Sequence, residues 1–154
     1  MRDFNDADRT KKSLRIDLSD NPGNLSKEAI HRLEEAVKAP VKEGCIPCPL
    51  GWKIASDIGV SRLDVGAMID RLGLRVTQCQ LGFFKVDKTP PAGKSTESLS
   101  EEVLSRVTSL HDRGELTCAN VFSLSRELSL KPLTIADIAN SRGYKLRQCQ
   151  LGCF

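Results

Sequence analysis

The chain has 154 residues, enough for one compact domain or two small ones and too few for a large α/β enzyme scaffold. Apolar residues make up 40% of the sequence and charged residues 28%, and no apolar run approaches the roughly 20 residues of a membrane-spanning helix. We therefore expect no membrane association. The formal net charge is +3, and basic and acidic residues are mixed along the whole chain, so no clustered basic field marks a nonspecific nucleic-acid binder.

The N-terminal segment, residues 1–24, is polar and rich in Asp. It has neither the apolar centre nor the small-residue cleavage site of a signal peptide, which predicts a cytoplasmic protein. Within it, residues 13–18 (SLRIDL) alternate in polarity, a pattern typical of a strand, although a disordered stretch is the other interpretation.

The sequence repeats itself after 70 positions. QCQLGFF at residues 78–84 aligns with QCQLGCF at residues 148–154, and the register holds without a gap back to Gly44 and Gly114. Such self-similarity predicts two copies of one fold. The near-identical tails indicate that the copies use them to pair with each other, while a tail that lines a site is the alternative.

The domain organisation follows from this repeat. The first copy covers residues 25–86 and the second residues 98–154, and both follow the N-terminal segment. Residues 87–97 between the copies have the Pro, Gly, Ser and Lys content of a linker.

In each copy the pattern predicts three helices and a strand, hence a mainly α fold with short β segments. The first helix begins after Ser26 and stops at Pro40, and its counterpart begins after Ser98. The second helix covers about residues 50–58, with a counterpart at about 121–128.

The third helix begins at Ser61, a helix cap with Asp64 three residues on, and ends at Gly73. Its counterpart has Pro132 in the first turn and stops at Gly143. After each glycine, LRVTQCQ and YKLRQCQ alternate with the period of a strand.

Residues 52–73 (WKIASDIGVSRLDVGAMIDRLG) read as a short helix, a tight turn and a longer helix. This stretch resembles the helix-turn-helix of winged-helix transcription regulators. Three residues carry the resemblance: Ala55 where the helices approach closely, Gly59 where the turn needs a positive φ, and Val60 as the apolar residue beneath the turn. The fold expected is therefore two tandem winged-helix-like repeats.

The resemblance implies a transcription regulator that binds double-stranded DNA with the third helix of each copy in the major groove, while Lys53 and Arg126 contact phosphates. The groove-facing residues would be Ser61, Arg62, Asp64 and Arg71 in the first copy and Lys131, Thr134, Asn140 and Arg142 in the second. In the second copy Ser125 and Ser129 replace the alanine and the glycine. The first copy is therefore expected to bind DNA more strongly.

A different class of function stays open, because trihelical domains of this shape also serve as protein-interaction modules. The chain would then be an accessory factor with a protein partner, for example a metal- or sulfur-containing enzyme. Asp64 and Asp70 repel phosphate, and the sequence after residue 78 leaves little room for a basic wing hairpin. We expect no catalytic role, because no phosphate loop, paired carboxylates or nucleophile triad is recognisable.

Six cysteines form the second candidate site. Two pairs recur at the repeat distance, and Cys45 with Cys48 forms a C-x-x-C. Packing as small apolar side chains is the first interpretation, a zinc or iron–sulfur site the second and a redox dithiol the third. The candidate ligands are Cys45, Cys48, Cys79, Cys118, Cys149 and Cys153.

Overall fold

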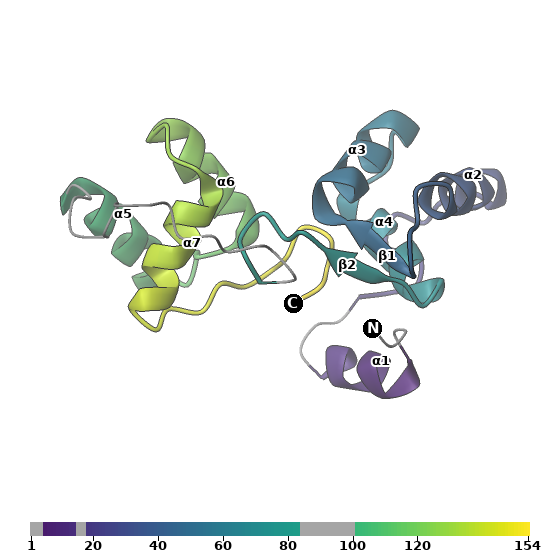
Figure 1. The fold of residues 1–154 in the computed structure, drawn as a ribbon, viewed down its shortest axis with the longest axis horizontal. Helices are drawn as coiled ribbons and strands as arrows, with labels where there is room; N and C mark the ends of the chain where they lie inside the picture. Colours follow the sequence, from purple (N-terminus) through teal and green to yellow (C-terminus); the bar gives the residue numbers. More distant parts are fainter. Residues whose placement is uncertain (1–4, 15–17, 84–100) are drawn as a thin grey trace. The chain divides into compact units, whose positions relative to one another are not determined.

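The structure is a computed structural model that describes residues 5–14, 18–83 and 101–154. In these ranges the chain forms seven helices and one two-stranded sheet (Figure 1). A mainly helical protein with short β segments is thus confirmed. The helices are α1 (Asp6–Ser13), α2 (Lys27–Lys38), α3 (Cys48–Ile58), α4 (Arg62–Arg71), α5 (Glu101–Asp112), α6 (Cys118–Glu127) and α7 (Pro132–Ser141), and the strands are β1 (Cys45–Pro47) and β2 (Arg75–Thr77). None of the described helices is long and apolar enough to cross a membrane.

The chain divides into two compact units. Unit 1 comprises Met1–Cys79 and Gln150–Phe154, and unit 2 comprises Gln80–Cys149. The last five residues of the second repeat therefore belong to unit 1, whereas residues 80–83 of the first repeat belong to unit 2. The compact units thus depart from the repeat ranges 25–86 and 98–154 at the two tails.

Unit 1 is built on α2, α3 and α4, which pack against one another. As predicted, α2 begins after Ser26, whose hydroxyl accepts a hydrogen bond from the backbone N–H of Ala29 at 3.2 Å. Its apolar stripe places Leu33 and Val37 in the core. Burying one such side chain stabilises the fold by roughly 1.5 to 3 kcal/mol relative to an exposed position, so the stripe anchors the helix.

The sheet of unit 1 is parallel. Cys45 in β1 lies opposite Arg75 in β2, and Pro47 lies opposite Thr77. The strand that the sequence predicts after Gly73 is therefore confirmed for the first repeat. A parallel pair differs from the antiparallel hairpin of a wing, so the winged-helix architecture is not confirmed.

Unit 2 repeats this local structure after 70 positions. α7 corresponds to α4 residue for residue, and the isolated parallel bridge between Thr117 and Arg147 corresponds to the pairing of Pro47 with Thr77. The strand predicted in the second repeat is thus reduced to this bridge. The predicted cap Ser98 of the counterpart helix lies outside the described residues, as does Phe84.

The backbone turns also recur. Five pairs of residues with positive φ match at the repeat distance: Gly44 and Gly114, Gly59 and Ser129, Gly73 and Gly143, Gln78 and Gln148, and Gly82 and Gly152. In the helix-turn-helix stretch, the N–H of Val60 donates to the carbonyl of Ala55 at 3.0 Å, and the N–H of Leu130 donates to the carbonyl of Ser125 at 2.9 Å. The second repeat therefore keeps the turn of the first despite its two serines.

The N-terminal segment contains a helix that the sequence did not predict. α1 begins after Asn5, which forms reciprocal cap hydrogen bonds with Asp8. Ser13, expected in a strand, is the last residue of this helix, and residues 15–17 of that expected strand lie outside the described residues. Leu18, the last residue of the expected strand, lies beside Gly152 in the C-terminal tail.

Candidate nucleic-acid interface

The third helix of the first repeat, α4, is buried over most of its length. Every residue from Asp64 through Ile69 is buried, because α2 and α3 pack against this helix and the tail residue Leu151 lies against Gly66. A helix that enters the major groove needs an exposed polar face. α4 has no such face in its central turns.

Asp64, one of the predicted groove-facing residues, has an interior role. Asp64 is 4% exposed, and its carboxylate accepts hydrogen bonds from the backbone N–H of Gly23 at 2.7 Å and from the N–H and hydroxyl of Ser61 at 3.0 and 2.6 Å. The hydroxyl of Ser61 in turn accepts a bond from the N–H of Asp64. The cap function predicted for these residues is confirmed, and it leaves Asp64 withdrawn from solvent.

Arg62 is engaged within unit 1. Its guanidinium carbon lies 3.6 Å from the ring centroid of Trp52, and one guanidinium nitrogen donates to the side-chain oxygen of Gln150. The arginine therefore joins α3, α4 and the C-terminal tail. A base contact by Arg62 would require breaking this arrangement.

The other predicted DNA contacts of the first repeat lie on the surface. Lys53 forms an ion pair with Asp57 one turn further along α3. Arg71 is exposed at the end of α4, and its carbonyl accepts a hydrogen bond from the guanidinium of Arg9 at 3.3 Å.

This end of α4 is covered by α1, which sequence reasoning missed. Lys12 pairs with Asp70, and Arg75 pairs with Asp8 at 3.1 Å. Burial raises the pKa of Asp70, although the hydrogen bond and charge of Lys12 lower it. The polar composition of α1 hides these contacts in the sequence, since the helix buries none of its own residues.

The third helix of the second repeat, α7, presents the contrasting picture. Its buried residues are Ile135, Ala136, Ile138 and Ala139, on one side of the helix. Asp137 and Asn140 are exposed on the other side, and Thr134 is half-buried there. Lys131 is the residue that precedes the helix, and its side chain makes no cap hydrogen bond. α7 therefore offers a polar face to a ligand.

Exposed basic residues of unit 2 lie at the two ends of α7, on α6 and in the segment after α7. The ion pairs among the described residues of unit 2 join Arg106 to Glu127, His111 to Asp112 and Arg113 to Glu115. Five exposed basic residues take part in none of these pairs: Arg126, Lys131, Arg142, Lys145 and Arg147. Arg126 does donate to the hydroxyl of Ser123 at 3.3 Å.

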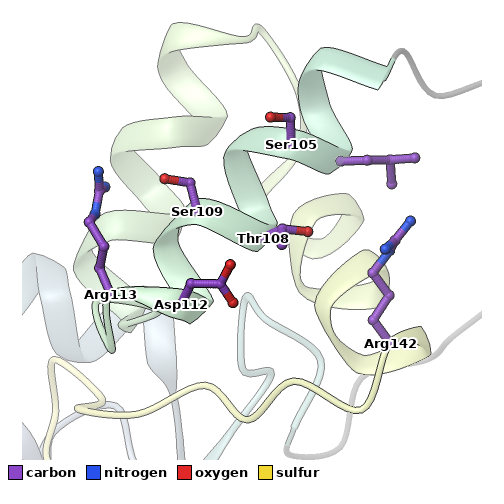
Figure 2. Close-up of a pocket in the computed structure, with 7 residues that line it drawn as sticks. Ser105, Thr108, Ser109, Asp112, Arg113 and Arg142 are labelled. Carbon is purple, nitrogen blue, oxygen red and sulfur yellow. The ribbon is translucent and has the colours of Figure 1, made fainter.

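A shallow, open surface pocket lies beside the end of α7. Figure 2 shows Arg142 at the end of α7, with the other labelled side chains on α5 and the turn that follows it. Hydroxyl groups of Ser105, Thr108 and Ser109 and the carboxylate of Asp112 line this space. Hydroxyl and guanidinium groups are common phosphate partners, whereas the carboxylate of Asp112 in the same lining opposes an anion.

The cysteines do not assemble a metal centre. All six are present as thiols, and the four that recur between the repeats are buried, whereas Cys45 and Cys153 are half-buried. Across residues 5–14, 18–83 and 101–154, no group of three or more His, Cys, Asp and Glu side chains is placed to hold a metal ion. The burial of Cys48, Cys79, Cys118 and Cys149 agrees with packing as small apolar side chains.

Two glycines of unit 1 have a role that sequence reasoning also missed. Gly51 in α3 and Gly66 in α4 both lie against Leu151. A glycine inside a helical pattern costs about 1 kcal/mol relative to alanine, so two such glycines in facing helices are a readable sign of a close approach.

Comparison of the chain with protein-family models, with curated proteins and with solved structures finds no match.

Proposed function

We propose that the protein binds double-stranded DNA through unit 2, with α6 and α7 as a helix-turn-helix, and acts as a transcription regulator. The observation that carries the proposal is the exposed polar face of α7, flanked by basic residues that take part in none of the ion pairs among the described residues of unit 2. α4 lacks such a face. The proposal therefore assigns DNA binding to the second repeat, the reverse of the order expected from the sequence.

The proposed DNA-contacting residues fall into two groups, those that bind phosphates and those that can contact bases. Lys131 and Arg142, at the two ends of α7, neutralise phosphates on either side of the groove, and Arg126 adds a phosphate contact from α6. Asn140 has the side chain that recognises adenine by two hydrogen bonds, and Thr134 can contact a base or a thymine methyl group. The exposed carboxylate of Asp137 repels phosphate but accepts a hydrogen bond from cytosine N4.

The test is a binding titration of the full chain against a random-sequence duplex pool, followed by selection of retained sequences. The proposal predicts affinity that falls steeply with salt, because phosphate contacts release counterions. Lys131→Ala should weaken binding to all sequences by about threefold to tenfold and reduce the salt slope by about one unit. Lys53→Ala, which removes a cation of unit 1, is the matched control and should bind like the parent chain.

Absence of retardation at low salt would overturn the proposal. So would an equal loss of affinity in the Lys53 and Lys131 variants, because the contact would then be distributed over the whole surface. Asn140→Ala should change which sequences are retained while leaving nonspecific binding intact.

A protein-interaction module is the second candidate, and a specific observation favours it. Unit 1 holds a five-residue extension, Gln150–Phe154, that comes from the other repeat. A body that binds a short segment in this way has the capacity expected of a peptide-recognition module.

A further inference from the structure

Unit 1 contains a groove that holds the C-terminal tail. The groove is formed by Leu18, Gly51 of α3, and Arg62, Leu63 and Gly66 of α4, and we call it the tail groove. Leu151 is 1% exposed and Gly152 is also buried. The tail therefore belongs to unit 1.

Each of the first three tail residues meets a distinct feature of the groove. The side-chain oxygen of Gln150 accepts a hydrogen bond from Arg62, which is itself fixed against Trp52. The backbone carbonyl of Leu151 lies so close to Gly66 that any β-carbon there would overlap it.

The next tail residue, Gly152, has a φ of +66°, and a β-carbon at this position would lie 2.8 Å from Leu18. Both the backbone conformation and the available space therefore require glycine here. Gln150, Leu151 and Gly152 are thus held by a side-chain hydrogen bond, by burial and by a position that requires glycine.

The two glycines of the groove are particular to the first repeat. Where unit 1 has Gly51 and Gly66, the second repeat has Val121 and Ala136, and both of these side chains are buried. The close approach of Leu151 in unit 1 therefore depends on glycine at positions where the second repeat has larger residues. Val121 and Ala136 show that the repeat fold accepts a valine and an alanine at these two positions.

The occupant of the groove is a segment foreign to its repeat. The first repeat carries its own Gln-Leu-Gly at residues 80–82, yet these residues belong to unit 2. The groove is instead filled by the corresponding tail of the second repeat. A second copy of the chain presents the same tail, and an exchange between chains replaces each contact with an identical one.

We propose that the tail groove binds the Gln-Leu-Gly tail of a second copy of this chain, giving a dimer with exchanged tails. In the monomer the tail is covalently attached, which gives it a high effective concentration, on the order of millimolar for linked segments. The closed monomer therefore dominates in dilute solution, and the exchanged dimer grows with protein concentration. This inference does not depend on DNA binding, since it concerns unit 1 alone.

Two variants test the proposal by complementation. A donor chain with Gly66→Ala keeps its tail but has a blocked groove, and a full-length acceptor chain with Leu151→Asp has an intact groove but a tail that cannot fill it. Neither can close on itself. Native mass spectrometry of the mixture should show a 1:1 complex at least ten times more abundant than either homodimer. A donor that also carries Leu151→Asp should form none.

The mixture is measured at 100 micromolar, about one tenth of the effective concentration of a tethered tail. If a folded donor and a folded acceptor both stay monomeric at this concentration, the proposal is wrong. Binding of a synthetic peptide of residues 148–154 to the acceptor, without binding of the donor chain, would overturn the second copy as occupant. If Gly66→Ala unfolds the donor, Gly51→Val replaces it, because the second repeat has valine at that position. Lys131→Ala should leave the 1:1 complex intact, which separates this test from that of DNA binding.

Discussion

Gly66 in α4 lies against the backbone carbonyl oxygen of Leu151, so the centre of the first repeat is completed by the end of the second. The contact brings a buried helix and a tail together at backbone distance. It explains why α4 has a glycine in its middle turn, where alanine would be the better helix former.

Gly66→Ala should lower the free energy of unfolding by about 0.5 to 2 kcal/mol. The loss of Leu151 burial, roughly 1.5 to 3 kcal/mol, exceeds the gain of about 1 kcal/mol in helix propensity. Urea denaturation followed by circular dichroism measures the change. Gly51→Ala is the graded control, because a β-carbon there meets only the flexible Leu151 side chain at 3.2 Å. A rise in stability for Gly66→Ala would show that the tail does not occupy this position.

Arg62→Ala should destabilise the protein and leave its affinity for DNA unchanged. The expected loss is about 1 to 2 kcal/mol, since the substitution removes the contact with Trp52 and the hydrogen bond to Gln150. Thermal denaturation and a DNA titration of the same sample separate the two effects. A tenfold loss of DNA affinity in a folded variant would place Arg62 at the DNA.

Asp64→Ala should be more damaging than Ser61→Ala, about 2 to 3 kcal/mol against about 1 kcal/mol. Asp64 accepts bonds from two residues while buried, and its loss leaves the N–H of Gly23 without its carboxylate partner. Equal effects for the two variants, measured by urea denaturation, would contradict the interior role of Asp64.

The sequence predicts local structure well where the signals are local. The caps at Ser26 and Ser61 and the stops at Gly73 and Gly143 are visible in the residues themselves, because each depends on neighbours a few positions away. The turn after α6 survives the replacement of glycine by Ser129, because serine there adopts a φ of +53°. The two serines therefore do not remove this turn from the second repeat.

Contacts between residues far apart in the sequence could not be predicted from the local patterns. The repeat register aligns residues 78–84 with residues 148–154 but does not say which body each tail packs against. The spacing of Ser61 and Asp64 predicts their cap correctly. It does not show that Asp64 also accepts a hydrogen bond from Gly23, which is far away in the chain. α1 is held by ion pairs to Asp70 and Arg75, so its own sequence carries little sign of it.

The burial of Asp70 predicts a pH dependence. Burial raises the pKa of Asp70 in the folded protein, so the folded state holds this proton more tightly than the unfolded state. The contribution of Asp70 to stability is therefore present at low pH and decreases as the pH rises through the raised pKa. The quantity to measure is the unfolding free energy of the parent chain minus that of Asp70→Asn. This difference should decrease as the pH rises from about 4 to about 7, which lies above the ordinary Asp pKa. A difference that rises with pH would mean that the Lys12 charge outweighs burial.

The most direct test of the central claim is a map of the DNA-contacting residues by amide NMR of the full chain, titrated with a retained duplex. If DNA binds to α7, the resonances of Lys131, Thr134, Asn140 and Arg142 should shift, while those of Asp64 through Ile69 in α4 should not. Shifts concentrated in α4, or none in either helix at saturating DNA, would contradict it.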